Sequence, residues 1–470
     1  MKRGNYMFRR KSIITILAAG MVLSSGTVYA QTISAPNAQS DTAFDNKIIK
    51  KISADNMYST IALLSEQPRE AGTEGEVRAV KYIEGQFKSL GFETKVIPFP
   101  IYDYRTNHVW VKSGGSNIEG AEPRAFSGSV TGNVTAPLLN VGKARLGEVP
   151  DEVAGKIALV ERGDITFIEK VQNVLDKGAV GVLMYNNSSN GNNFGQAAEG
   201  QDIPSVAITR EQGLALVEKL KSGPVTATLD VDIEKIEKTS YVVEAKLKPN
   251  KNKDTGQIVT VGAHHDSVHG GPGANDDASG VSAVLELARI FAKAPIDTEV
   301  RFLTFGSEER GLVGSSFYAS QLPKDDVDRM VAHFQMDMIG GRDAGADNPA
   351  GGLIMYTIDG QKNLVTDLGA AAGVRTMGVA IPYGQLGRSD HQPFHELGIP
   401  SALFIHSPVE PWYHQPTDTI DKISKEKLQQ AAEIVGASVY QIARPETPAL
   451  ENSRVAAGIV DYDFEDRPVD

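Results

Sequence analysis

The chain has 470 residues, of which 41% are hydrophobic and 23% are charged, and its formal net charge is −12 at pH 7. This composition is typical of a globular protein of two or three domains and excludes a collagen-like or coiled-coil chain. The acidic balance argues against a nucleic-acid partner, because such a surface needs clustered Lys and Arg. The absence of cysteine excludes disulfides, cysteine catalysis and thiolate metal ligands.

Residues 1–30 have the three-part pattern of a secretory signal peptide. Five basic residues and no acid precede the apolar run SIITILAAGMVLSSG, and small residues precede Gln31. A membrane anchor is the alternative, but the apolar run of about fifteen residues is shorter than the roughly twenty that a spanning helix needs. We therefore expect a cleaved, exported chain with no membrane span, either secreted freely or retained at the cell wall.

The first predicted elements follow the leader in chain order. Residues 31–55 are polar and predict little regular structure. Residues 76–90 place apolar side chains at helical spacing, and Gly91 is a natural helix end. The run FETKVIPFP, residues 92–100, predicts a strand.

Residues 133–232 predict a separate small α/β unit. KIALVERG, AVGVLMYNN and IPSVAIT are strand-like, and they alternate with the helix-like runs FIEKVQNVLDKG and EQGLALVEKLKSG. This segment contains no histidine, so it is a poor place for a metal site.

From residue 240 a second and larger α/β pattern begins. The strand-like runs are YVVEAKLK, QIVTVGAH, EVRFLTFGS, VAHFQMDMIG and SALFIH, and helix-like runs such as VSAVLELARIFAK and KEKLQQAAEIVGASVYQIA lie between or after them. This alternation predicts an α/β fold with a mixed, mainly parallel sheet covered by helices on both faces. The acidic, proline-bearing tail after 446 predicts no regular structure.

Histidines and carboxylates follow several of the predicted strands. They are His264, Asp276, Glu308, Glu309, Asp337 and His414. Ligands bind at the carboxyl ends of strands in open α/β sheets, so these side chains are expected at one edge. Each has an ordinary structural alternative, such as turn formation or helix capping, but an acid at Asp337 between two methionines needs a partner. Imidazole plus several carboxylates suits a pair of metal ions better than one catalytic zinc.

Five motifs carry a family likeness: GAHHDSVHGGPGANDDASG, RFLTFGSEERGLVGSSFY, FQMDMIG, GRSDHQPF and EPWYH. In content and order they resemble the M28 family of zinc aminopeptidases, above all exported bacterial members with an inserted protease-associated (PA) domain. The resemblance covers about residues 55–445. It implies a zinc-peptidase domain built from 31–132 and 233–445, a PA insert at 133–232 and an acidic tail at 446–470.

The resemblance also implies a ligand set for two zinc ions. His264 and Asp337 would hold one ion, Glu309 and His414 the other, and Asp276 would bridge both. The peptide bond between Asp276 and Asp277 is expected to be cis. His265 would be a bystander.

The remaining roles implied by the resemblance concern catalysis. Glu308 would be the general base for a water that bridges the two zinc ions, and the Tyr413 hydroxyl would stabilise the oxyanion. Asp266 would orient the His264 imidazole. Arg388 and Asp390 would shape the substrate pocket. Asp277 and Arg310 stand where relatives vary, so they are expected to affect specificity.

The function implied is that of a secreted dinuclear zinc aminopeptidase acting on peptides or proteins with a free N-terminus. A carboxypeptidase of the same superfamily is an alternative, although no arginine cluster lies near the motifs to bind substrate carboxylates. Glutamine cyclisation on one zinc is a remoter alternative. A non-catalytic PA-bearing binding protein should lack ligands or the base, all of which are present here.

Overall fold

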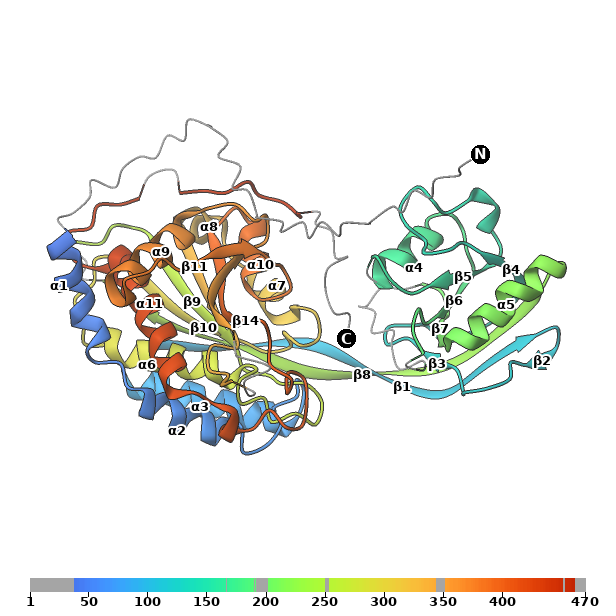
Figure 1. Cartoon of the computed structure of the whole chain (residues 1–470), viewed down its shortest axis with the longest axis horizontal. Helices are drawn as coiled ribbons and strands as arrows, with labels where there is room; N and C mark the ends of the chain where they lie inside the picture. The colour runs from blue at the N-terminus through green and yellow to red at the C-terminus, as the bar shows by residue number, and fades with distance from the viewer. Residues whose placement is uncertain are drawn as a thin grey trace, which may run out of the picture.

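Two lobes joined by a long antiparallel ribbon make up the computed structural model (Figure 1). The ribbon consists of β1 (Glu93–Ser113) and β8 (Thr226–Leu247). The structure describes residues 38–165, 167–189, 191, 202–249, 253–343, 351–450 and 453–460, so the predicted signal peptide lies outside the described residues. Within these ranges no helix has the length and apolar character needed to cross a membrane.

The larger lobe contains a mixed sheet in the order β13-β12-β14-β11-β9-β10-β8. β9 (Ile258–His264), β10 (Glu299–Phe305), β11 (Met330–Met336) and β14 (Ser401–Ser407) run parallel to their neighbours in this group. β8 pairs antiparallel with β10, and β12 (Gly352–Thr357) pairs antiparallel with β14 and parallel with β13 (Tyr383–Gln385). The predicted mixed, mainly parallel sheet is confirmed.

Helices cover both faces of this sheet. One face packs against α2 (Ala54–Leu64), α3 (Glu74–Ser89), α6 (Ala278–Phe291), α9 (Leu364–Met377) and α11 (Lys425–Ala443). The other face packs against α7 (Val313–Ser320), α8 (Lys324–Arg329) and α10 (His391–Glu396). Neighbouring residues of one strand point to opposite faces, so Phe302 joins the first core and Leu303 the second.

The smaller lobe continues the sheet through β8 in the order β4-β5-β6-β7-β3. These strands are β4 (Gly132–Asn140), β5 (Ile157–Glu161), β6 (Gly181–Tyr185), β7 (Ser205–Ile208) and β3 (Arg124–Ala125). A short β2 (Ser116–Asn117) pairs with the end of β1. The helices are α4 (Phe167–Leu175), α5 (Arg210–Ser222) and the 3-10 turn Asp151–Val153.

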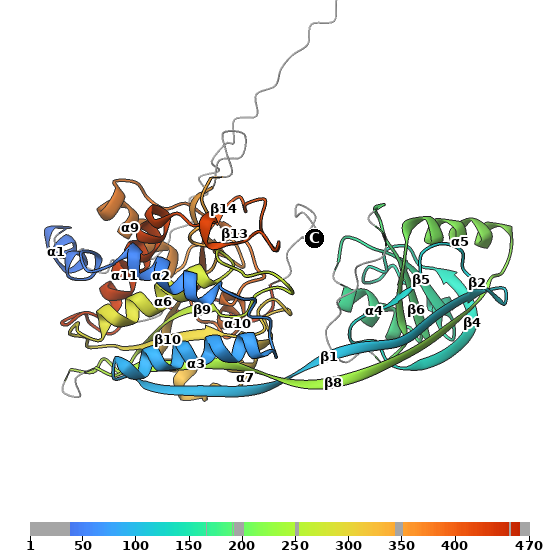
Figure 2. The ribbon, with the colours of Figure 1, turned by 90° about the horizontal axis from the view of Figure 1, so that it is seen from below.

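The boundary between the lobes runs through the ribbon. Val111 and Phe126 belong to the hydrophobic cores of the smaller lobe, although both precede residue 133, where the sequence places the start of the insert. Figure 2 shows β1 and β8 leaving the larger lobe beside α3 and continuing into the smaller one. Each of the two long strands therefore contributes to both lobes.

Two segments expected to lack regular structure are fixed to the larger lobe. Residues Ala38–Ile49 form α1, whose buried Ile48 packs in the core beside α11 and whose Asp45 accepts from Arg375 Nε at 2.5 Å. The prediction that residues 31–55 are loose is thus wrong from residue 38 onward, because tertiary contacts stabilise a weakly patterned helix. After residue 446 the described tail has no helix or strand, as predicted, although Val455 N donates to Gly398 O at 3.2 Å.

Candidate metal centre

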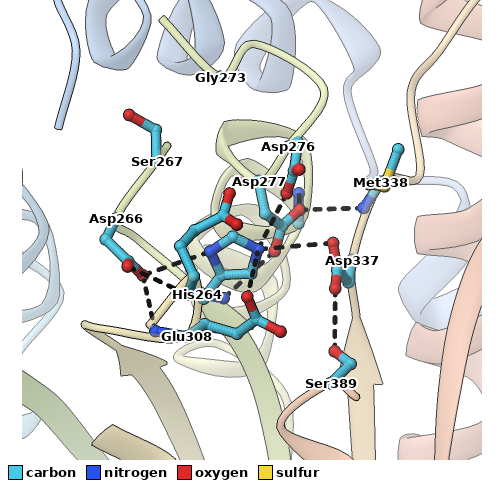
Figure 3. A network of polar contacts seen from close by, with 12 residues as sticks. His264, Asp266, Ser267, Gly273, Asp276, Asp277, Glu308, Asp337, Met338 and Ser389 are labelled. Atoms are coloured by element: carbon cyan, nitrogen blue, oxygen red, sulfur yellow. Dashed lines mark hydrogen bonds and ion pairs between the residues drawn. The ribbon is translucent and has the colours of Figure 1, made fainter. Parts of the chain in front are cut away.

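The candidate site lies where β9, β10 and β11 end. His264 is the last residue of β9, Asp337 directly follows β11, and Glu308 comes three residues after β10 ends at Phe305. The three strands are parallel neighbours, so their carboxyl ends meet at one edge. Figure 3 shows His264 with Asp266 on one side and Asp276 and Asp337 on the other.

A first group of potential ligands surrounds the His264 imidazole. Its Nε2 lies 3.1 Å from Asp276 Oδ1 and 3.5 Å from Asp337 Oδ1. All three residues are buried, and their ligand atoms lie within 4.8 Å of one another. This spacing is close enough for one metal ion to contact all three.

A second group shares Asp276 with the first. His414 Nε2 lies 3.3 Å from Asp276 Oδ2 and 3.1 Å from Glu309 Oε2. These three atoms also lie within 4.8 Å of one another. The two oxygens of Asp276 therefore face two different groups, as a bridging carboxylate requires.

Two buried carboxylate oxygens indicate that the groups fit cations. Asp337 Oδ1 and Glu309 Oε1 accept no hydrogen bond from any residue that the structure describes. A buried unpaired carboxylate oxygen is costly, and a metal ion would satisfy it. Imidazole nitrogen with carboxylate oxygen is a donor set that zinc takes.

The site's titratable groups are shifted in the directions expected of a cation site. Burial disfavours the charged imidazolium of His414, but its contacts with Asp276 and Glu309 outweigh burial and raise its pKa to about 10. Burial and the Asp276 charge raise the pKa of Glu309 to about 7. Burial also raises the pKa of Glu308 well above its usual range. The carboxylates thus favour a positive charge at this edge of the sheet.

Asp266 contacts both His264 and the turn that carries Glu308. Its Oδ1 lies 3.4 Å from His264 Nδ1 and accepts the Glu308 N–H at 3.1 Å, while Oδ2 accepts the Glu309 N–H at 3.4 Å. One carboxylate therefore faces the imidazole and holds the two adjacent glutamates. Ser389 acts similarly on Asp337, since its Oγ donates to Oδ2 at 2.9 Å.

Asp277 has a structural position that the sequence did not reveal. It is fully buried, caps the N-terminus of α6, and accepts backbone N–H groups of Gly280, Met338 and His264 at 2.7, 3.2 and 3.2 Å. The Asp276–Asp277 peptide bond is cis, as expected. Its carboxylate is thus occupied by backbone N–H groups, and the expectation that Asp277 affects specificity stays a prediction.

Left-handed backbone occurs next to or within the site at three residues other than glycine. Ser307 has φ 61°, Met338 has φ 57° and His414 has φ 57°. Such conformations cost energy in residues with a Cβ and persist where the surroundings impose them. They lie immediately before Glu308, immediately after Asp337 and at a ligand candidate itself, so backbone strain is concentrated where the polar side chains converge.

The other residues singled out in the sequence lie in different surroundings. Tyr413 stacks on His414 with ring centroids 3.7 Å apart, and burial with nearby carboxylates raises the pKa of its phenol. Arg388 is exposed. Asp390 is fully buried and accepts from Gln335 Nε2 at 3.1 Å. Arg310 is paired with Asp103 on β1 at 2.8 Å.

The neighbouring histidines differ sharply in their contacts. His265 is buried, with Nδ1 3.1 Å from Thr304 Oγ1 and Nε2 3.4 Å from Glu76 Oε1. Its ring thus lies between β10 and α3, whereas the ring of His264 lies among the candidate ligands. His269 is exposed and contacts Glu70.

A mainly parallel sheet covered by helices, with two His/carboxylate groups at its carboxyl edge, is the arrangement of a metal-dependent hydrolase. Residues 243–439 match the model of peptidase family M28, and residues 130–216 match that of the PA domain. The aminopeptidase YwaD of Bacillus subtilis is 36% identical over 93% of this chain and 95% of its own length. The chain belongs to peptidase family M28.

Solved structures agree with this assignment. An aminopeptidase from Aneurinibacillus sp. strain AM-1 is 48% identical, with a TM-score of 0.75 over 91% of this chain and 98% of that one. BSAP, a zinc aminopeptidase from Bacillus subtilis, is 36% identical, with a TM-score of 0.64 over 86% of this chain and 98% of that one. The family and the PA domain expected from the sequence motifs are thus confirmed.

Proposed function

We propose that this protein is an exported aminopeptidase that holds two zinc ions and removes N-terminal residues from peptides or proteins. The observation that carries the proposal is the pair of ligand groups that share Asp276. His264 and Asp337 would complete one zinc site, and Glu309 and His414 the other. The names of the similar aminopeptidases support the substrate class, and the leader-like residues 1–30 support export.

Bound zinc would supply a Lewis acid for the substrate carbonyl and lower the pKa of a coordinated water. Glu308 would accept a proton from the attacking water and return it to the leaving amine. Its Oε2 lies 4.0 Å from His264 Nε2, so it faces the ligand cluster. Burial raises its pKa well above the ordinary acid range, and the charge on His264 opposes this shift only in part.

Two further contributions come from residues around the ligands. The Tyr413 phenol remains protonated because burial and the carboxylates raise its pKa, so it can donate a hydrogen bond to the oxyanion. The carboxylates of Glu308 and Asp337 would attract the substrate's α-ammonium group. This charge preference favours a free N-terminus over a free C-terminus.

The carboxypeptidase alternative would need a basic pocket for the substrate carboxylate, and two arginines near the motifs are held by other groups of the chain. Arg310 is bound to Asp103 at 2.8 Å, and Arg69 is buried and donates to backbone carbonyls such as His265 O at 2.9 Å. Both guanidinium groups are thus engaged within the chain. A one-zinc cyclase would not need the second ligand group, and a binding protein would not need Glu308.

The first experiment measures zinc per chain in the mature protein after dialysis, together with hydrolysis of aminoacyl amides and of peptides blocked at the N-terminus. We expect two zinc ions and cleavage only where the α-amine is free. One ion with full activity would favour the cyclase-like arrangement. Cleavage of N-blocked peptides from the C-terminal end would establish the carboxypeptidase, and absence of both zinc and activity after zinc addition would leave a binding protein.

A further inference from the structure

We propose that Asn275, Glu410 and Asp418 form a clasp that positions His414 against the shared ligand Asp276. None of the three is a ligand candidate, and all are at most 4% exposed. The inference rests on the proposed two-zinc function, since it assigns the clasp to the site that contains His414.

Asn275 lies directly before Asp276 and connects three parts of the site. Its Nδ2 donates to Glu410 Oε2 at 3.1 Å, and its Oδ1 accepts the Gly340 N–H at 2.8 Å. Its carbonyl oxygen accepts from Ser279 Oγ at 2.7 Å. Through its side chain and its carbonyl, Asn275 thus holds together the loop after β11, the start of α6 and the segment that carries His414.

Asp418 binds the backbone on which the shared ligand stands. Its Oδ1 accepts the Asn275 N–H at 3.0 Å, and its Oδ2 accepts the Asp276 N–H at 3.0 Å. Its own carbonyl accepts the Ala274 N–H at 3.1 Å. Three successive N–H groups of the Asp276 loop are therefore held by one residue, four positions after His414.

In the sequence, Glu410 lies four residues before His414 and Asp418 lies four residues after it. Pro411 and Gln415 to Thr417 between them are exposed, and the His414 side chain itself is 30% exposed. His264 and Asp337, by contrast, are placed by the ends of buried strands. An exposed loop with a residue at φ 57° needs fixed ends if its imidazole is to stay near Asp276. The two acids supply those fixed ends.

The test compares zinc binding by Asp418→Ala with that of the wild-type full-length protein, using equilibrium dialysis over a range of free zinc. We expect the affinity for one of the two ions to fall about 10- to 100-fold, the range found when residues behind metal ligands are removed. The other ion shares Asp276 but keeps His264 and Asp337 at the ends of buried strands, so it should lose less affinity, and kcat should recover when free zinc is raised. Asp421→Ala, which removes a nearby exposed carboxylate bound to Lys422 and Thr419, is the matched control.

A second pair of variants keeps the proposal testable if Asp418→Ala fails to fold. Glu410→Gln retains an oxygen that can accept from Asn275 Nδ2, whereas Glu410→Leu does not. We expect only the Leu variant to lose affinity for one ion. Equal behaviour of the two, an equal loss of affinity for both ions, or two ions bound normally by Asp418→Ala would overturn the clasp. A wild-type protein that binds no zinc would instead refute the proposed function.

Discussion

Adjacent carboxylates at positions 308 and 309 face different partners. Glu309 Oε2 lies 3.1 Å from His414 Nε2 within the second ligand group, whereas Glu308 belongs to neither group. Asp266 fixes both through their backbone N–H groups. One residue can therefore be a ligand while its neighbour remains available for proton transfer.

Glu308→Gln should keep both zinc ions and lower kcat by about 10²- to 10⁴-fold, because an amide has the shape of the carboxylate but cannot accept the proton. Steady-state kinetics with zinc analysis of the same sample checks this. Glu309→Gln is the control, since it should lose zinc as well as turnover. Unchanged turnover in Glu308→Gln would remove this residue from the mechanism.

His264→Ala should lose zinc, and His265→Ala should keep it. His264 is the centre of the first ligand group, while His265 contacts Thr304 and Glu76. Metal analysis of the two purified variants, with thermal unfolding to confirm that each is folded, measures the difference. The opposite result would mean that the motif has been read one residue out of register.

The ligand candidates could be predicted from the sequence because each follows a recognisable strand or stands in a compact motif. The residues that hold them could not. Asp418 binds Asn275 across 143 positions, and Glu410 binds it across 135. No local periodicity connects such pairs, and an acid four residues from a histidine is by itself an ordinary loop residue.

Helix α4 of the smaller lobe carries an uncommon buried cation. Lys170 has no exposed surface, and its Nζ donates to Lys143 O at 2.5 Å. Burial lowers its pKa to about 8. The unfolded chain, in which lysine has its usual pKa of about 10.4, therefore binds more protons between pH 8 and 10. Stability should rise with pH across this window.

Comparison of the wild-type protein with Lys170→Met should reveal this linkage. As pH rises from 8 to 10, the free energy of unfolding of the smaller lobe should increase in the wild type relative to the variant. The change should be up to about 2 kcal/mol, less where water reaches the ammonium. Denaturant unfolding at several pH values measures this change in the free energy of unfolding. The control is Lys177→Met, because Lys177 is an exposed lysine paired with Asp151. A difference that does not vary with pH would contradict a depressed pKa.

Helices and strands with a clear pattern of apolar residues in the sequence were predicted well, whereas those with a weak pattern were not. Strands β9, β10 and β11 are short segments rich in apolar residues and buried along their whole length, which is typical of parallel strands. Helix α1 has little amphipathic pattern and is held by particular contacts such as Asp45 with Arg375. Its existence depends on side chains that are distant in sequence.

The two lobes have separate hydrophobic cores, and every ligand candidate lies in the larger lobe. Chelation of zinc should therefore lower the unfolding temperature of the larger lobe and leave that of the smaller lobe unchanged. A ligand present at 1,000 times its Kd stabilises by about 4 kcal/mol, so we expect a shift of about 10 °C.

The chain's two tryptophans can report this difference, since Trp110 lies in the part of β1 within the smaller lobe and Trp412 lies two residues before His414 in the larger one. Trp412→Phe leaves fluorescence from the smaller lobe, and Trp110→Phe leaves fluorescence from the larger. Thermal melts with and without a chelator give the two unfolding temperatures. A single transition that moves in both variants would show that the lobes unfold as one unit.

The length of the ribbon formed by β1 and β8 determines the distance between the two lobes. A strand advances about 3.4 Å per residue, and every second side chain along it points to the same face. Removing two residues from each strand would therefore bring the lobes closer by about 7 Å and leave each remaining side chain on its own face of the ribbon. Removing one residue from each strand would move those side chains to the opposite face. We therefore expect this ribbon to tolerate insertions and deletions only in matched pairs, which would change the distance between the lobes in steps of fixed length and leave the ligand candidates in place.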